Sequence, residues 1–464
     1  MTSPAPSPTP STPGHSPEPS EQFDVVLRGE RVLTPEGIRA AVVGIRDGRI
    51  VAIEPVGADL AAREMVELAA DEVLIPGLVD SHVHVNEPGR TEWEGFASAT
   101  RAAAAGGVTT IVDMPLNSLP PTVDVAALET KRDAARGQCF VDVGFWGGAV
   151  PGNTADLHPL HEAGVFGFKC FLSPSGVPEF PPLEPAEMEA DLAELTRVGA
   201  MLIVHAEDGH VLDEAQPAIP GRHYADFLAS RPAQAESSAI ATVIEAARRT
   251  GGRAHILHLS DADALPMIAR ARADGVRLSV ETCPHYLCLD SGSVPDGATA
   301  YKCCPPIRDE SNQDRLWQGL LDGTIDIVVT DHSPSPLGLK ALDTGDFAVA
   351  WGGVASLQIG FRAVWTEARR RGIPLETVVG WMSAGPADLV GLPRKGRLAV
   401  GADADLVVLA PEETFTVDVT RLHHKNPITP YSGQQLHGVV RRTLLRGRSI
   451  EATPHGELIR RGES

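Results

Sequence analysis

The sequence predicts an α/β protein: a (β/α)8 barrel of the TIM type, with a small β-sandwich domain built from both ends of the chain. Two observations support this class. Between residues 76 and 390, short apolar runs alternate with helical stretches, the pattern of a parallel sheet covered by helices. On either side, residues 23–75 and 391–455 carry short alternating segments separated by Gly and Asp-Gly turns, which are typical of β structure.

The central region contains eight apolar runs with the length of barrel strands. They lie at residues 78–84, 108–113, 140–147, 165–171, 201–205, 254–258, 276–282 and 326–331. Helical stretches stand between them, among others at 94–105, 187–197, 236–249 and 311–321. Eight such units over roughly 310 residues favour a TIM barrel. The alternative, a doubly wound open sheet, often carries a Gly-x-Gly-x-x-Gly fingerprint, which this chain lacks.

The two ends of the chain predict a composite β domain. Near the N-terminus, residues 24–27, 41–45 and 50–53 read as strands, and residues 406–409 and 439–447 resemble them at the other end. Residues 1–22 are rich in Pro, Ser and Thr and have neither the basic nor the apolar region of a secretory signal. We expect a disordered tail there, because it offers little apolar surface to bury.

Composition excludes several classes of function. The net charge of −21 disfavours binding to nucleic acid or to an anionic membrane. No apolar run approaches the roughly 18 residues of a membrane span. The six cysteines form no Cys-x-x-Cys pair, so we expect reduced thiols and a cytoplasmic protein that acts on a small molecule.

His82 and His84 are the most informative pair in the sequence. They end the first apolar run of the barrel, and alternate residues of a strand point to the same side. Two imidazoles on one side of a strand can bind a divalent metal. Taken alone, the pair could also be two ordinary hydrogen-bonded histidines.

Other polar residues end the later barrel strands. Lys169 ends the fourth, His205 the fifth, His258 the sixth and Asp331 the eighth. The C-terminal ends of barrel strands meet at one rim, so these residues should lie together with His82 and His84. Each has a structural alternative: an ion-paired lysine, a core histidine or a carboxylate that caps a turn. His255, three residues before His258, would face the opposite side, and we expect it to be structural.

This set of residues predicts a site for two divalent metal ions. Burial favours the neutral amine of Lys169, which can capture CO2 and become a carbamate that bridges both ions. A bridging hydroxide could then attack a carbonyl, with Asp331 as general base and later as general acid. The predicted reaction is hydrolysis of an amide-like C–N bond. Zinc is the expected metal, although Mn, Co, Ni and Fe also suit these ligands.

Several longer motifs carry a family resemblance. They lie at residues 82–95, 113–118, 167–172, 281–286, 302–308, 331–334, 350–354, 424–425 and 429–431. With them the chain, from about residue 23 to 447, resembles the amidohydrolase superfamily. Within it, the chain is similar to the cyclic amidases, which include dihydroorotase, dihydropyrimidinase (hydantoinase) and allantoinase, and the motifs point to the allantoinase branch.

The resemblance implies a role for each residue of the set. His82, His84 and Asp331 would bind the first metal, and His205 and His258 the second. Lys169, as N6-carboxylysine, would bridge the two. The implied reaction opens the ring of allantoin to give allantoate in purine catabolism. A homotetramer is also implied. Our candidates for substrate contacts are Asn117 and Ser118.

Three positions separate the branches of this family. Asn86 stands where dihydroorotases carry an arginine for the substrate carboxylate, and Ser335 where they carry a histidine and many allantoinases a cysteine. Pro174 stands where dihydropyrimidinases carry a tyrosine, and we expect the loop 173–177 to cover the site. Allantoin has no carboxylate, so the absence of the arginine and the histidine fits it. The alternatives are a hydantoinase for other cyclic ureides and a non-catalytic scaffold.

Overall fold

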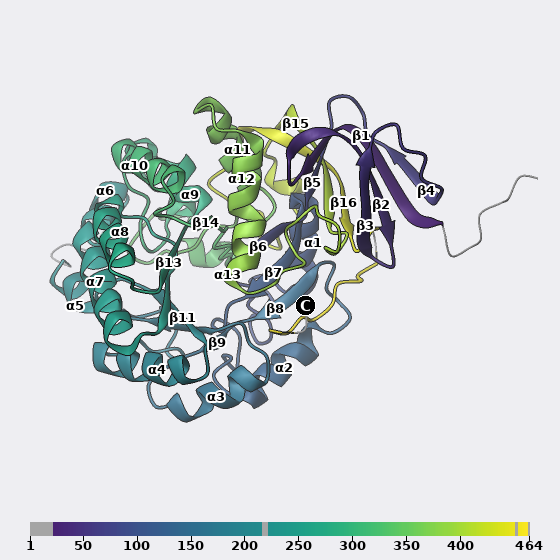
Figure 1. The fold of residues 1–464 in the computed structure, drawn as a ribbon. Coiled ribbons are helices and arrows are strands. Elements are labelled where there is room, and N and C mark those ends of the chain that lie inside the picture. The colour runs from purple at the N-terminus through teal and green to yellow at the C-terminus, as the bar shows by residue number, and fades with distance from the viewer. Residues whose placement is uncertain (1–21, 216–220, 451–452, 463–464) are drawn as a thin grey trace, which may run out of the picture.

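The computed structural model describes residues 22–215, 221–450 and 453–462. The predicted disordered tail, except Gln22, lies outside the described residues. An α/β unit and a β-rich unit lie side by side, and strands from both ends of the chain, purple and yellow, share the β-rich unit (Figure 1). None of the helices in the described parts of the chain is long and apolar enough to cross a membrane.

The α/β unit is built on parallel strands at the predicted places. They are β6 (Leu78–Val83), β7 (Val108–Asp113), β8 (Asp142–Phe145), β9 (Gly147–Gly148), β10 (Phe168–Phe171), β11 (Met201–His205), β12 (Arg253–Ile256), β13 (Leu278–Thr282) and β14 (Ile327–Val328). Strands β6 to β8 form one sheet and β9 to β14 another, in sequence order. The backbone N–H of Phe166 donates to the carbonyl of Phe145 at 3.0 Å, and a parallel bridge pairs Val83 with His332. This is the arrangement of a TIM-barrel-type unit.

Helices cover the outside of these strands (Figure 1). They are α1 (Phe96–Gly106), α2 (Val125–Ala135), α3 (Thr154–Glu162), α4 (Pro185–Arg197), α5 (Gly209–Glu214), α6 (Tyr224–Ala229), α7 (Ala233–Thr250), α8 (Leu265–Ala273), α9 (Pro284–Cys288), α10 (Glu310–Leu321), α11 (Gly360–Arg370), α12 (Leu375–Met382) and α13 (Ala384–Leu389). The four helices named from the sequence are confirmed as α1, α4, α7 and α10. Helix α7 buries Ile240, Val243 and Ile244, whose spacing of three and four residues places them on one side.

The β-rich unit is one hydrogen-bonded sheet. Its strands are β1 (Phe23–Thr34), β2 (Gly37–Arg46), β3 (Arg49–Pro55), β4 (Ala62–Glu67), β5 (Val73–Pro76), β15 (Leu406–Thr416), β16 (Gln435–Leu445) and β17 (Arg448–Ser449). The order is β17-β16-β15-β5-β1-β2-β3, with β4 beside β1. Strand β5 therefore joins the N-terminal strands to the C-terminal ones. The β-sandwich form of this unit remains a prediction.

Several barrel strands end earlier than the sequence predicts. The predicted strand 254–258 ends at Ile256, and 326–331 is reduced to two residues, because His258 and Asp331 adopt left-handed backbone conformations with φ of 36° and 44°. The predicted strand 140–147 is divided into β8 and β9. Left-handed non-glycine residues are strained and tend to occur at functional sites. The regular strand conformation thus ends before two of the predicted metal ligands, His258 and Asp331.

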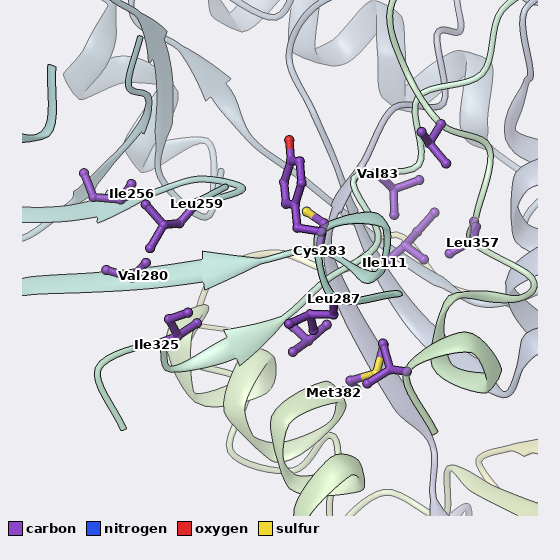
Figure 2. Packing of buried hydrophobic residues seen from close by; sticks show 14 of the residues in the cluster. Val83, Ile111, Ile256, Leu259, Val280, Cys283, Leu287, Ile325, Leu357 and Met382 are labelled. Atoms are coloured by element: carbon purple, nitrogen blue, oxygen red, sulfur yellow. The ribbon is translucent and has the colours of Figure 1, made fainter. Parts of the chain in front are cut away.

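Apolar side chains fill the layer between strands and helices. Figure 2 shows part of it: Val83, Ile111, Ile256 and Val280 come from four strands, and Met382 comes from α12. All but Met382, at 5%, are at most 1% exposed. Because residues alternate along a strand, Val83 points into this layer while His82 is left for the barrel interior. A tightly packed apolar layer therefore surrounds the strands that carry the polar site residues.

A buried ion cluster joins the barrel to the β-rich unit. Nζ of Lys395 lies 2.6 Å from Asp142 of β8, 2.8 Å from Asp405 and 3.1 Å from Asp403. Asp142 also pairs with Arg446, which follows β16, at 2.7 Å. The three aspartates raise the pKa of Lys395 against the effect of its burial. This cluster links parts of the chain that lie far apart in the sequence.

Candidate metal centre and active site

The structure brings all six predicted metal ligands together. His82, Lys169 and His205 stand on β6, β10 and β11, while His84, His258 and Asp331 lie one to three residues after the ends of β6, β12 and β14. All six are buried. All except His82 line one cavity of about 270 Å³. The strand ends therefore converge as the barrel pattern predicts.

Three of the ligands form a compact group. Nε2 of His82 lies 3.1 Å from Oδ1 of Asp331, and Nε2 of His84 lies 3.5 Å from the same oxygen. The ligand atoms of this group lie within 4.8 Å of one another. Two imidazoles and a carboxylate suit a divalent ion such as zinc. The carboxylates of Asp331 and Glu281 raise the pKa of His82 to about 9, against the effect of burial. The group thus favours one positive charge, which a metal ion would supply in place of the proton.

The second pair of histidines is arranged in a similar way. Nδ1 of His205 lies 2.9 Å from Nε2 of His258. Burial lowers the pKa of both imidazoles, so they are neutral near pH 7. Two neutral imidazoles that turn ring nitrogens toward one point can share a metal ion.

Two glutamates fix the tautomers of these ligands. Oε1 of Glu281 lies 2.5 Å from Nδ1 of His82, and Oε2 of Glu207 lies 2.8 Å from Nε2 of His205. Each carboxylate accepts the N–H of its histidine, which leaves the lone pair of the other ring nitrogen for a metal. Sequence reasoning gave neither residue a role. Glu207 could have been found, because it lies two residues after His205 and alternation favours the same side.

Lys169 stands between the two groups of histidines. Its side chain is 1% exposed, and Nζ lies 3.5 Å from Nε2 of His82. No carboxylate in the described parts of the chain forms an ion pair with it. Burial lowers its pKa to about 8, although the carboxylates of Asp331 and Glu281 oppose this. An amine in such a place loses its proton readily, as carbamate formation requires.

The structural alternatives can now be compared with the geometry. His255 hydrogen-bonds Ser279 at 2.8 Å and Glu281 at 2.9 Å through its two ring nitrogens, so its predicted structural role is confirmed. In His84 and His258, Nε2 lies toward Asp331 and His205, respectively, and Nδ1 is buried without a hydrogen-bond partner among the described residues, so neither imidazole is held by a structural hydrogen-bond pair as His255 is. The donor set of the site therefore fits a pair of divalent ions.

The two candidates for substrate contacts differ in position. Asn117 lines the cavity, whereas Ser118 does not belong to its wall and is fully buried. Asn117 has a left-handed backbone with φ of 66°, which turns the chain away after it. Pro174, Ser175 and Gly176 line the cavity, as expected for a covering loop.

Sequence reasoning gave no role to several other residues of the wall. They are Leu116, Phe171, Arg231, Lys302, Cys303, Cys304, Ser333, Ala350, Trp351, Gly352 and Gly353. Arg231 pairs with Glu207, with Nε 3.0 Å from Oε1, and so supports His205 indirectly. Most of these residues stand on loops, where no periodic pattern indicates which side chain faces the cavity.

A TIM-barrel-type unit with histidines, a lysine and an aspartate at its strand ends defines a class, the metal-dependent hydrolases of small molecules. The chain belongs to the amidohydrolase family, whose model matches residues 73–450. Membership implies a binuclear centre for divalent metal ions.

Known proteins resemble the chain over nearly its whole length. An allantoinase of Streptomyces avermitilis is 59% identical over 443 residues, which cover 94% of this chain and 99% of that protein. An allantoinase of Saccharomyces cerevisiae is 46% identical, covering 82% of this chain and 84% of that protein. Among solved structures, an L-hydantoinase (dihydropyrimidinase) from Arthrobacter aurescens has a TM-score of 0.88 at 30% identity, covering 95% of this chain and 98% of that one.

Proposed function

We propose that this protein is an allantoinase, which hydrolyses the cyclic amide bond of allantoin to give allantoate. The observation that carries the proposal is the set of six buried ligand side chains, of which all but His82 line one cavity, in a chain 59% identical to a protein named allantoinase. A hydantoinase is less well supported, because the solved hydantoinases and dihydropyrimidinase that resemble the chain are 26–31% identical to it. A non-catalytic scaffold would not need to keep six buried polar ligands together.

The metal ions would be held by the chain in two groups. His82, His84 and Asp331 would hold one and His205 and His258 the other, with Lys169 as N6-carboxylysine between them. Bound divalent ions would supply a water of lowered pKa and would polarise the carbonyl under attack. Zinc is the proposed metal; Mn, Co, Ni and Fe remain open.

Asp331 is the proposed general base and acid. Its imidazole neighbours, His82 first, hold the pKa of its carboxyl well below the usual range although burial opposes this, so the carboxylate is ionised at neutral pH. It lines the cavity, where it can take a proton from water and pass it to the leaving ring nitrogen. The C–N bond breaks, the carbonyl carbon gains the oxygen of water, and the products are a carboxylate and an N–H group.

We propose a closed (β/α)8 barrel over residues 76–390 and a composite β domain from 23–75 and 391–455. The bridge between Val83 and His332 and the shared sheet support this division. We also propose a homotetramer in the cytoplasm with a disordered tail, and no nucleic acid or membrane partner. Asn117 is the proposed substrate contact, whereas Ser118, which is buried and does not line the cavity, does not fit the contact predicted for it.

The test is a turnover assay. The purified protein is supplied with a divalent metal and bicarbonate, and allantoate is measured from racemic allantoin, with hydantoin and dihydrouracil in parallel. The proposal expects rapid turnover of allantoin that a chelator abolishes and fresh metal restores. Turnover of dihydrouracil or hydantoin but not allantoin, with metal bound, would contradict it.

A further inference from the structure

Two sequence motifs have no role in the metal centre, and the structure joins them. They are residues 302–308 and 350–354. Nζ of Lys302 donates to the carbonyl of Ala350 at 2.6 Å, and the N–H of Gly353 donates to the carbonyl of Lys302 at 2.8 Å. Residues from both motifs line the cavity that holds the metal ligands. Together they form one continuous piece of its wall.

This wall carries an unpaired positive charge at Lys302. Within residues 22–215, 221–450 and 453–462, no carboxylate lies within ion-pair distance of its ammonium group. Two other basic residues line the wall: Lys169, which belongs to the proposed metal centre, and Arg231, which is paired with Glu207. A half-buried ammonium group without a counter-charge is costly, since it loses part of its hydration. Such a group in a cavity is a candidate for ligand binding.

The hydrogen bonds of Lys302 leave one donor free. An ammonium group has three N–H donors, and those of Lys302 reach only the carbonyls of Ala350 and, at 3.5 Å, Ala348 among the described acceptors. Nζ also lies 5.3 Å from the centroid of the Phe227 ring, and Lys302 belongs to the cavity wall. Burial lowers the pKa of Lys302, and the third N–H is present only on the charged ammonium group, because a neutral amine keeps two.

Lys340 provides a natural comparison. It also has no carboxylate partner within the described residues, and its Nζ donates to the carbonyls of Trp351 at 3.1 Å and Gly353 at 2.5 Å. It therefore supports the same loop as Lys302. Unlike Lys302, it is 2% exposed and does not line the cavity. Lys340 therefore supports this loop without reaching the cavity, whereas Lys302 supports the loop and also lines the cavity.

We propose that Lys302 binds the carbonyl oxygen of the acyclic ureido arm of the substrate, and so selects ring ureides with such an arm over the bare hydantoin ring. The inference rests on the proposed function. Allantoin is uncharged, so its recognition depends on hydrogen bonds, and a ureido oxygen is a strong acceptor for an ammonium donor. Lys302 is thereby a specificity-determining residue.

Binding is the sharpest test, because it separates recognition from turnover. In an Asp331→Asn background loaded with metal, calorimetry measures Kd for allantoin and for hydantoin, which has the same ring without the arm. Lys302→Met should weaken allantoin binding by about 10- to 100-fold and leave hydantoin binding unchanged. Lys302→Arg, which keeps a donor, should restore part of the preference. Lys340→Met, the matched control, should change both ligands alike.

Two results would overturn the inference: equal losses for both ligands in Lys302→Met, as expected for loop support alone, or no preference for allantoin before Lys302 is changed. Lys302→Gln serves if Lys302→Met does not fold. Failure of the proposed function gives a different result, namely that the unaltered enzyme does not hydrolyse allantoin although the Lys302-dependent preference is still measured in binding.

Discussion

Oε1 of Glu281 lies 2.5 Å from Nδ1 of His82, and the same oxygen accepts the backbone N–H of His258 at 3.2 Å. One carboxylate thus orients a ligand of the first group and the backbone of a ligand of the second. Although burial opposes it, His82 and His255 lower the pKa of Glu281 to about 2. The two halves of the metal centre are therefore built around one fixed negative charge.

Replacing this charge should weaken metal binding. Glu281→Gln keeps the size but can present an N–H to His82 and removes the preference for its ligand tautomer. We expect metal affinity to fall about 10- to 100-fold, measured as metal content at a series of buffered free-metal concentrations. Glu189→Gln, on the surface of α4, is the control. Unchanged affinity in Glu281→Gln would show that Glu281 is only a packing residue.

Asp331→Asn should separate metal binding from turnover. The amide can still coordinate a metal weakly but cannot accept a proton, so kcat on allantoin should fall by about 10²- to 10⁴-fold. Metal content should be normal or moderately reduced. The measurement is steady-state kinetics at saturating metal, with the exposed Asp263→Asn as control. Near-normal turnover would remove Asp331 from the role of base.

Lys169→Ala should lose bound metal and activity, because the bridging group is gone. Short carboxylic acids such as acetate should restore part of both by supplying a carboxylate in its place. Metal content and turnover are measured with and without the acid. Full metal retention and activity without any acid would argue against a bridging carbamate.

Reconstitution should depend on pH through Lys169. Only the neutral amine captures CO2, and burial lowers the pKa of Lys169 to about 8. The neutral fraction of the Lys169 amine therefore rises about tenfold per pH unit below pH 8 and levels off above it. Metal-free protein treated with bicarbonate and metal should regain activity faster as pH rises to about 8, at constant dissolved CO2. A rate that is flat between pH 6 and 8 would contradict this.

The ion cluster at Lys395 should be a determinant of stability. Lys395→Met leaves the buried carboxylates of Asp142 and Asp405 with less positive charge, and removing one partner of a buried ion pair costs about 3–5 kcal/mol. We expect a lower urea midpoint of unfolding with unchanged metal ligands. Arg397→Met, which removes the exposed pair with Asp388, should change the midpoint little. Equal midpoints in the two variants would contradict this role.

The sequence predicts the fold class and the ligand set because both depend on local patterns. Alternation places His82 on the side opposite Val83, and the order of strands in a barrel brings Lys169, His205 and Asp331 to one rim. The strand ends were less well predicted, since the left-handed turns at His258 and Asp331 depend on tertiary contacts.

Residues that reach the cavity from loops could not be assigned in this way. Arg231 enters beside Glu207 from the segment before α7, and Lys302 lies close to Ala350 only after folding. Ser118 shows the converse: it is next to a wall residue in sequence, but the backbone turn at Asn117 directs it elsewhere. Adjacency along a loop does not determine which side chain meets a ligand.

The place of β5 between β1 and β15 has a consequence during synthesis on the ribosome. The strands that flank β5 leave the ribosome far apart in time, because the whole barrel is translated between Pro76 and Leu406. At a translation rate of about 5–20 residues per second, on the order of tens of seconds pass between the synthesis of β5 and that of β15. During that interval the apolar edge of β5 is open to other nascent chains, so the N-terminal strands are the part of this protein that a chaperone has most reason to shield.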